Sequence, residues 1–99
     1  EAVYALDANG MQISNNVSKN KKLQGIGKDE DRSDRAYFYK TIKEHRCTLT
    51  DPYPSLISNT MVVTSSFPIY DENDNLLCII CVDISLANIL RMVHPSSID

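Results

Sequence analysis

The most constraining feature of this chain is an uninterrupted apolar run at residues 76–82, which ends at Asp83. The run is far shorter than the roughly 20 apolar residues of a membrane span, so it predicts a buried strand over residues 76–84. Residues 60–69 are rich in β-branched side chains and predict a second long strand. The polar residues 70–75 between them favour a turn. This hairpin is expected to form the centre of a sheet.

Residues 2–6 alternate along a strand, with Ala2, Tyr4 and Leu6 on one face. Asn9-Gly10 follows, a dipeptide that accepts the positive φ of a tight turn, and residues 11–14 are predicted to be the returning strand. The polar residues 15–31 predict a loop.

Ser33 is a suitable N-cap, and Asp34 follows it where a helix dipole favours negative charge. The helix is predicted to run to about His45. Its apolar positions recur at helical spacing, so they are expected to face the sheet. They are Tyr37, Phe38, Thr41 and Ile42.

Residues 48–50 predict a short strand, and two prolines make residues 51–55 irregular. Ser85 is expected to cap a last helix over residues 86–93, which Pro95 ends. The order of elements predicts an α+β fold over residues 1–99: a single domain with a central antiparallel sheet of about five strands, flanked by helices.

Charge and motifs exclude several functions. The net charge of −3 argues against nucleic-acid binding, which requires a basic face. The motifs of nucleophilic, phosphate-binding or metalloprotease enzymes are missing from the sequence, and so is metal-ligand spacing, so neither an enzyme, a cofactor nor a metal site is predicted. Cys78 and Cys81 have C-x-x-C spacing but fall on opposite faces of a strand, so they are interpreted as small hydrophobes. Because the chain opens with Glu1 and not Met, we expect it to be part of a longer protein.

Four segments of the chain carry motifs that belong together. They are SDRAYF at residues 33–38, DPY at 51–53 followed by VVTSSFPIYD at 62–71, LLCIICVDISL at 76–86, and YALDANG at 4–10. Together these segments resemble the Cache (PDC, PAS-like) sensor domains of bacterial transmembrane receptors. The resemblance covers nearly the whole chain in the right order.

The resemblance implies an extracytoplasmic, periplasmic sensor domain in an inner-membrane protein. Such domains belong to chemoreceptors, histidine kinases or cyclic-dinucleotide enzymes, and they lie between membrane helices that fall outside these residues. It also implies a long N-terminal helix upstream of Glu1, a single ligand pocket, and a possible homodimer. The expected partner is a small molecule, an organic acid or an amino acid.

The resemblance also implies where a ligand would bind. Arg35-Ala36-Tyr37-Phe38 matches the family pattern R-x-aromatic-aromatic, whose Arg binds a ligand carboxylate. A guanidinium suits that role because its planar fork meets a carboxylate bidentately. The other predicted ligand-binding residues are Tyr37, Tyr53, Thr64, Ser66 and Asp83.

Other roles remain open for these residues. Arg35 could pair with Asp31 or Asp34 at an exposed helix start, and Asp83 could anchor the turn into the last helix. Amino-acid binders of the family carry a Tyr five residues before the Arg, where this chain has Glu30, and Phe38 lacks a hydrogen-bonding group. A short organic acid therefore fits as well as an amino acid. The alternative function is a ligand-free dimerisation or protein-interaction module of the same fold.

Overall fold

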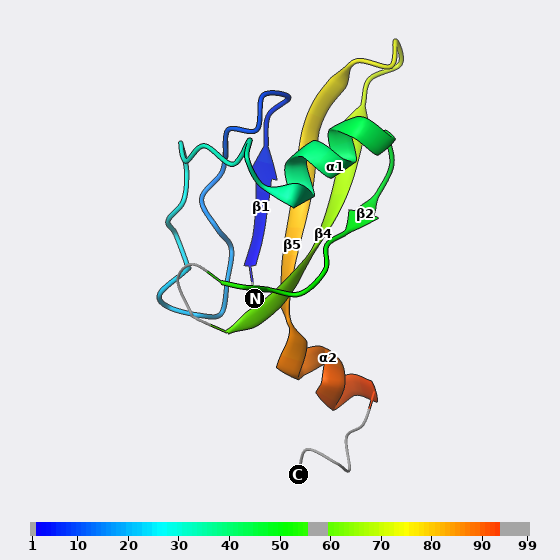
Figure 1. Ribbon diagram of the computed structural model, residues 1–99. Coiled ribbons are helices and arrows are strands. Elements are labelled where there is room, and N and C mark those ends of the chain that lie inside the picture. Colours follow the sequence, from blue (N-terminus) through cyan, green and yellow to red (C-terminus); the bar gives the residue numbers. More distant parts are fainter. Residues whose placement is uncertain (1, 56–59, 94–99) are drawn as a thin grey trace.

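A computed structural model describes residues 2–55 and 60–93 of the chain (Figure 1). Seven elements follow one another, with a long loop between the first strand and the first helix. They are β1 (Ala2–Leu6), α1 (Ala36–Glu44), β2 (Thr48–Leu49), β3 (Tyr53–Pro54), β4 (Met61–Tyr70), β5 (Leu76–Ser85) and α2 (Leu86–Val93).

The strands form one antiparallel sheet in the order β1-β5-β4-β2, with β3 also paired to β4. The predicted α+β class and five-stranded sheet are confirmed. As expected from its apolar sequence, β5 is central, and Ile79 and Cys81 on its inner face are fully buried. In the register of the sheet, Asp83 lies between Ala2 of β1 and Thr64 of β4.

Helix α1 covers one face of the sheet, where it contacts β4 and β2 (Figure 1). Tyr37 and Thr41 are buried beneath it, and Phe38 and Ile42 pack against the same core, as the helical spacing predicted. The Thr41 hydroxyl donates to the carbonyl of Tyr37 at 3.0 Å and lies 2.7 Å from the Thr48 hydroxyl. The bond with Thr48 ties α1 to β2 at the edge of the sheet.

The predicted start of α1 was wrong. The helix begins at Ala36, and its N-cap is Arg35, whose backbone is extended and whose side chain makes no capping hydrogen bond. The reason is local, because the Asp31 carboxylate accepts the N–H of Ser33 at 2.9 Å and the N–H of Arg35 donates to the carbonyl of Arg32 at 3.0 Å. These bonds make residues 31–35 a turn, and the helix starts only after it.

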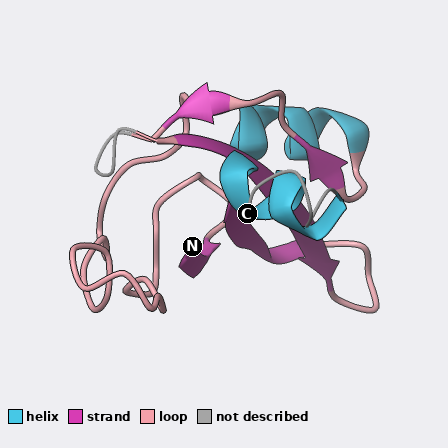
Figure 2. Cartoon of the chain, turned by 90° about the horizontal axis from the view of Figure 1, so that it is seen from below, coloured by secondary structure: helices cyan, strands magenta, loops and turns pink. Residues whose placement is uncertain are grey.

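The predicted first hairpin is only partly present. Gly10 turns the chain at φ 88°, and Leu6 forms a bridge with Gln12. The returning segment is not a continuous strand, because the N–H of Gln12 donates to the carbonyl of Glu30 at 2.9 Å. The long loop thereby folds back beside β1, at one side of the sheet (Figure 2).

Helix α2 leaves the lower end of β5 and extends away from the sheet (Figure 1). Its predicted cap is confirmed, since the N–H of Asn88 donates to the Ser85 hydroxyl at 3.0 Å. The predicted stop at Pro95 lies outside the described residues. In the described part of the chain, neither helix combines the length and the apolar character that crossing a membrane requires.

Candidate ligand-binding site

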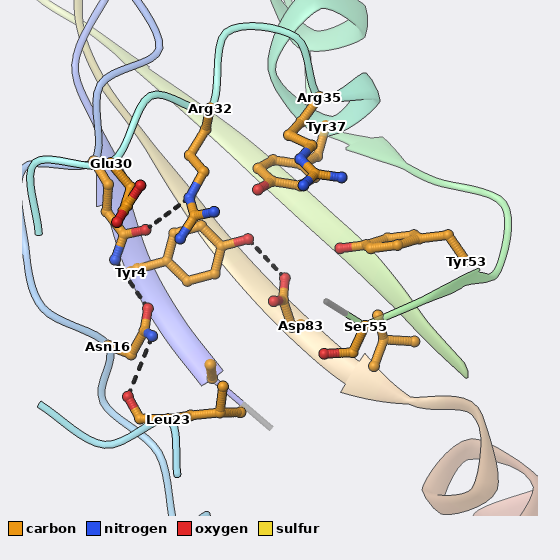
Figure 3. A pocket seen from close by; sticks show the side chains of 13 residues that line it. Tyr4, Asn16, Leu23, Glu30, Arg32, Arg35, Tyr37, Tyr53, Ser55 and Asp83 are labelled. Atoms are coloured by element: carbon orange, nitrogen blue, oxygen red, sulfur yellow. Dashed lines mark hydrogen bonds between the residues drawn. The ribbon is translucent and has the colours of Figure 1, made fainter. Parts of the chain in front are cut away.

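A cavity of about 280 Å³ lies over the inner face of the sheet, beside the start of α1 (Figure 3). This volume is at the small end of the roughly 300–1,000 Å³ that is typical of small-molecule sites. The long loop, the turn before α1, β3 and β5 all contribute side chains to its wall. The cavity therefore joins segments that are distant in sequence.

Asp83 supplies a carboxylate to this cavity from the inner face of β5. Its Oδ1 accepts hydrogen bonds from the Tyr4 hydroxyl and the Thr64 hydroxyl, both at 2.8 Å. Burial raises the pKa of Asp83, and the two hydrogen bonds counteract only part of that effect. A cationic group that comes near a carboxylate in such a position stabilises its ionised form.

Three tyrosines form one wall of the cavity. The rings of Tyr4 and Tyr37 meet edge to face at 6.0 Å between centroids, and those of Tyr37 and Tyr53 stack at 6.5 Å. The Tyr53 hydroxyl also makes a short hydrogen bond with the Thr64 hydroxyl. Burial raises the pKa of all three phenols, so they remain protonated donors at neutral pH.

Arg35 lines the cavity together with Tyr37, which follows it by two positions at the start of α1 (Figure 3). Its side chain is 30% exposed, and its Nε lies 3.8 Å from the Asp34 carboxylate. That distance is too long for a hydrogen bond, and an exposed ion pair of this kind contributes little to stability. The guanidinium is therefore only weakly held by its neighbour.

Four of the six predicted site residues, Arg35, Tyr37, Tyr53 and Asp83, line this one cavity. Thr64 lies behind them and is fully buried, with its hydroxyl bonded to Asp83 and Tyr53. Ser66 is also on the inner face, but it is fully buried and contacts the Cys81 sulfur at 3.8 Å. Neither of these two lines the cavity. The binding roles of all six residues stay predictions.

Several polar residues of the wall were not predicted as site residues, among them Gln12, Asn16 and Arg32. The Gln12 side chain donates to the Asn16 side chain at 2.9 Å and accepts from Nε of Arg32 at 3.2 Å. Gln12 and Asn16 are buried. The sequence feature that could have indicated the buried Gln12 side chain is Gly27, where a Cβ would come within 2.6 Å of the Gln12 amide. A glycine in a polar loop can mark such a close approach.

The chemistry of the cysteines agrees with their interpretation as hydrophobes. Cys81 is buried on the inner face of β5, whereas Cys78 is half-buried on the outer face. Burial raises the pKa of the Cys81 thiol to about 12, so the reactive thiolate is scarce at neutral pH. Among the described residues, His, Cys, Asp and Glu side chains form no cluster that could hold a metal ion.

The fold is similar to solved chemoreceptor domains. The ligand-binding domain of Campylobacter jejuni chemoreceptor Tlp3 in complex with 4-methylisoleucine is 22% identical with a TM-score of 0.73, covering 93% of this chain and 35% of that chain. The ligand-binding domain of the Pseudomonas aeruginosa PAO1 amino acid chemoreceptor PctC with GABA is 18% identical with a TM-score of 0.71, covering 96% and 43%. Identities this low show the fold alone.

A protein of Syntrophus aciditrophicus (strain SB) named "Citrate (Re)-synthase" is 31% identical over 91 residues, which make up 89% of this chain but 14% of that protein. So small a share of its length carries no activity over to this chain. Residues 3–91 match the family described as "Methyl-accepting chemotaxis protein-like, first PDC sensor domain". The chain therefore belongs to this family of sensor domains.

Proposed function

We propose that the domain binds a small carboxylate ligand, an organic acid or an amino acid, with Arg35 as the group that holds the carboxylate. The observation that carries the proposal is the presence of opposite charges in the wall of one cavity: the Arg35 guanidinium, next to the start of α1, and the Asp83 carboxylate on the sheet. A ligand with a carboxylate at one end and an amino group at the other satisfies both.

The cavity favours such a ligand for physical reasons. The Arg35 fork can donate two parallel hydrogen bonds to a carboxylate, and its contact with Asp34 is weak enough to be replaced. Asp83 would pair with an ammonium group, and the stacked rings of Tyr37 and Tyr53 provide an apolar wall. The ligands of the Tlp3 and PctC structures, 4-methylisoleucine and GABA, both carry these two groups.

An organic acid remains a full alternative to an amino acid. Glu30 lines the cavity, where a Tyr donor was expected for an amino-acid binder, and Phe38 packs into the core. The cavity therefore lacks two of the hydrogen-bonding groups implied by the resemblance.

We infer that the domain lies outside the cytoplasm and is the sensor of a membrane receptor, whose output domain lies in another part of the protein. The family and the neighbouring chemoreceptor domains support this placement. The kind of receptor is left open between chemoreceptors, histidine kinases and cyclic-dinucleotide enzymes. Binding would be read out through α2, which directly follows β5.

Thermal unfolding against a panel of amino acids and short organic acids tests the proposal. A ligand that binds only the folded state raises the melting temperature, with a stabilisation of about 2.7 kcal/mol at 100 times its Kd. Arg35→Ala should abolish the shift for every acid that produces one. Arg46→Ala is the matched control, because Arg46 is exposed and, within residues 2–55 and 60–93, pairs only with Glu44, at 3.0 Å.

Two results would contradict the proposal. A shift that survives Arg35→Ala would mean that another group holds the carboxylate. A panel that produces no shift at all would favour a ligand-free interaction module.

A further inference from the structure

A second arginine reaches the same cavity as Arg35. Arg32 lies three positions earlier, in the turn before α1, and lines the cavity together with Arg35 (Figure 3). It is half-buried, and its positive charge opposes part of the rise that burial causes in the pKa of Asp83 and of Tyr37. Two guanidinium groups therefore share one cavity of about 280 Å³ with the carboxylate of Asp83.

Arg32 is held in place by the buried amides. Its Nε donates to Oε1 of Gln12 at 3.2 Å, and Nε2 of Gln12 donates to Asn16 at 2.9 Å and to the carbonyl of Ser14 at 2.8 Å. Asn16 donates in turn to the carbonyl of Leu23 at 3.2 Å. Gln12 is 1% exposed, so the acceptor of Arg32 is fixed by the fold.

This arrangement leaves the outer edge of the guanidinium available. In the described parts of the chain, neither Nη group of Arg32 has a hydrogen-bond or ion-pair partner. An arginine held through Nε presents its two Nη groups as a fork, the geometry that binds a carboxylate bidentately. Ordering the side chain beforehand also reduces the entropy lost on binding.

We propose that Arg32 forms a second anion subsite, so that the preferred ligand is a dicarboxylate with one carboxylate on Arg35 and the other on Arg32. This inference rests on the proposed function and makes its ligand more specific. The ligand can be a dicarboxylic organic acid or an acidic amino acid, which share the two carboxylates and differ in the amino group next to Asp83.

Glu30 also lines the cavity and opposes a second carboxylate. Its side chain is exposed, whereas Arg32 is half-buried. Solvent screens an exposed charge more strongly than one that is partly removed from water, so the attraction of Arg32 prevails. The opposing charge also supplies a second test, because its removal should favour the dicarboxylate further.

The test is isothermal titration with ligands matched in length. Succinate is compared with butyrate, and L-aspartate with L-2-aminobutyrate, so that each pair differs by one carboxylate. The unaltered chain should bind the dicarboxylate of at least one pair about 10- to 100-fold more tightly, as expected for charge-assisted hydrogen bonds. The pair that shows the preference tells whether the ligand carries an amino group.

In Arg32→Gln the preference should fall to within about threefold, while the affinity for the monocarboxylate stays unchanged. Arg46→Gln removes the same charge at a distant, exposed site and should leave the preference as it was. Glu30→Gln should increase the preference. If Arg32→Gln unfolds the chain, the Glu30→Gln variant provides the test instead. An unchanged preference for the dicarboxylate in that variant overturns the inference.

Three results would overturn the second subsite. They are an unaltered chain without preference, an equal loss for both ligands of a pair in Arg32→Gln, and tighter binding of L-2,4-diaminobutyrate than of L-aspartate. If monocarboxylates still bind and depend on Arg35, only the second subsite fails. If no acid of either kind binds, the proposed function fails as well.

Discussion

Asp83 is the residue whose surroundings differ most from those of an ordinary surface carboxylate. It lies on a largely apolar strand, with a hydroxyl from β1 and a hydroxyl from β4 bonded to the same oxygen. Burial makes its ionisation costly, and its pKa is raised. The charged carboxylate therefore reduces stability, because its hydrogen bonds and the nearby positive charges compensate only part of the cost of burial.

This raised pKa predicts a pH dependence of stability. Between the ordinary value of 3.8 and the raised one, the folded chain binds more protons at Asp83 than the unfolded chain. The free energy of unfolding should therefore fall as pH rises through that window. In Asp83→Asn this fall should disappear.

Urea denaturation of both proteins from about pH 3 to 8 measures the difference. Asp31 and Asp71, whose pKa values are lowered, act in the opposite sense and below 3.8, and both remain in the variant. Parallel curves for the two proteins above pH 4 would show that Asp83 ionises without penalty in the fold.

At the scale of the elements, the turn after β1 and the turn before α1 lie against each other. Gly10 is buried at φ 88°, and its carbonyl accepts the N–H of Arg32 at 2.8 Å. A Cβ at Gly10 would lie 2.7 Å from the Cα of Ser33. This contact sets where the Arg32 and Arg35 segment lies over the sheet.

Gly10→Ala should therefore destabilise the chain by about 3 kcal/mol, through its positive φ and its overlap with the Ser33 backbone. Gly25→Ala is the matched control, because Gly25 has a similar φ of 77° but nothing within 4 Å of its Cβ position. It should cost about 1 kcal/mol, from the left-handed backbone alone. Equal losses in urea denaturation would mean that the Ser33 contact is dispensable.

The elements that the sequence predicted well are those with a strong local pattern. The apolar run of β5, the β-branched residues of β4 and the apolar spacing of α1 each determine an element from its own residues. The start of α1 was missed because Asp31, and not Ser33, organises the turn before it. Local capping preferences could not tell these two short polar side chains apart.

The site was predicted in the same uneven way. Arg35, Tyr37, Tyr53 and Asp83 belong to segments with recognisable patterns, and they line the cavity. Gln12 and Arg32 were missed because their burial depends on the pairing of residues 11–12 with residues 30–31. Such a pairing across a polar loop leaves no periodic trace in the sequence.

For the molecule as a whole, stability is expected to be uneven. Strand β5 is paired on both sides, by β1 and β4, whereas α2 has no buried residue. Amide hydrogen exchange should therefore be at least about 100-fold slower in the middle of β5 than in α2. Equal rates at the two places would show that α2 is held as firmly as the sheet.

The hydrogen-bonded Asp83 is also connected to α2 by a very short stretch of strand. Asp83 stands two residues before Ser85, whose hydroxyl caps α2, a separation of about 7 Å of extended backbone. Any displacement of the carboxylate by an incoming ligand would reach the first turn of α2 through rigid strand, with no intervening loop to absorb it. Occupancy of the cavity and the orientation of the last helix would then be mechanically coupled through the last residues of β5.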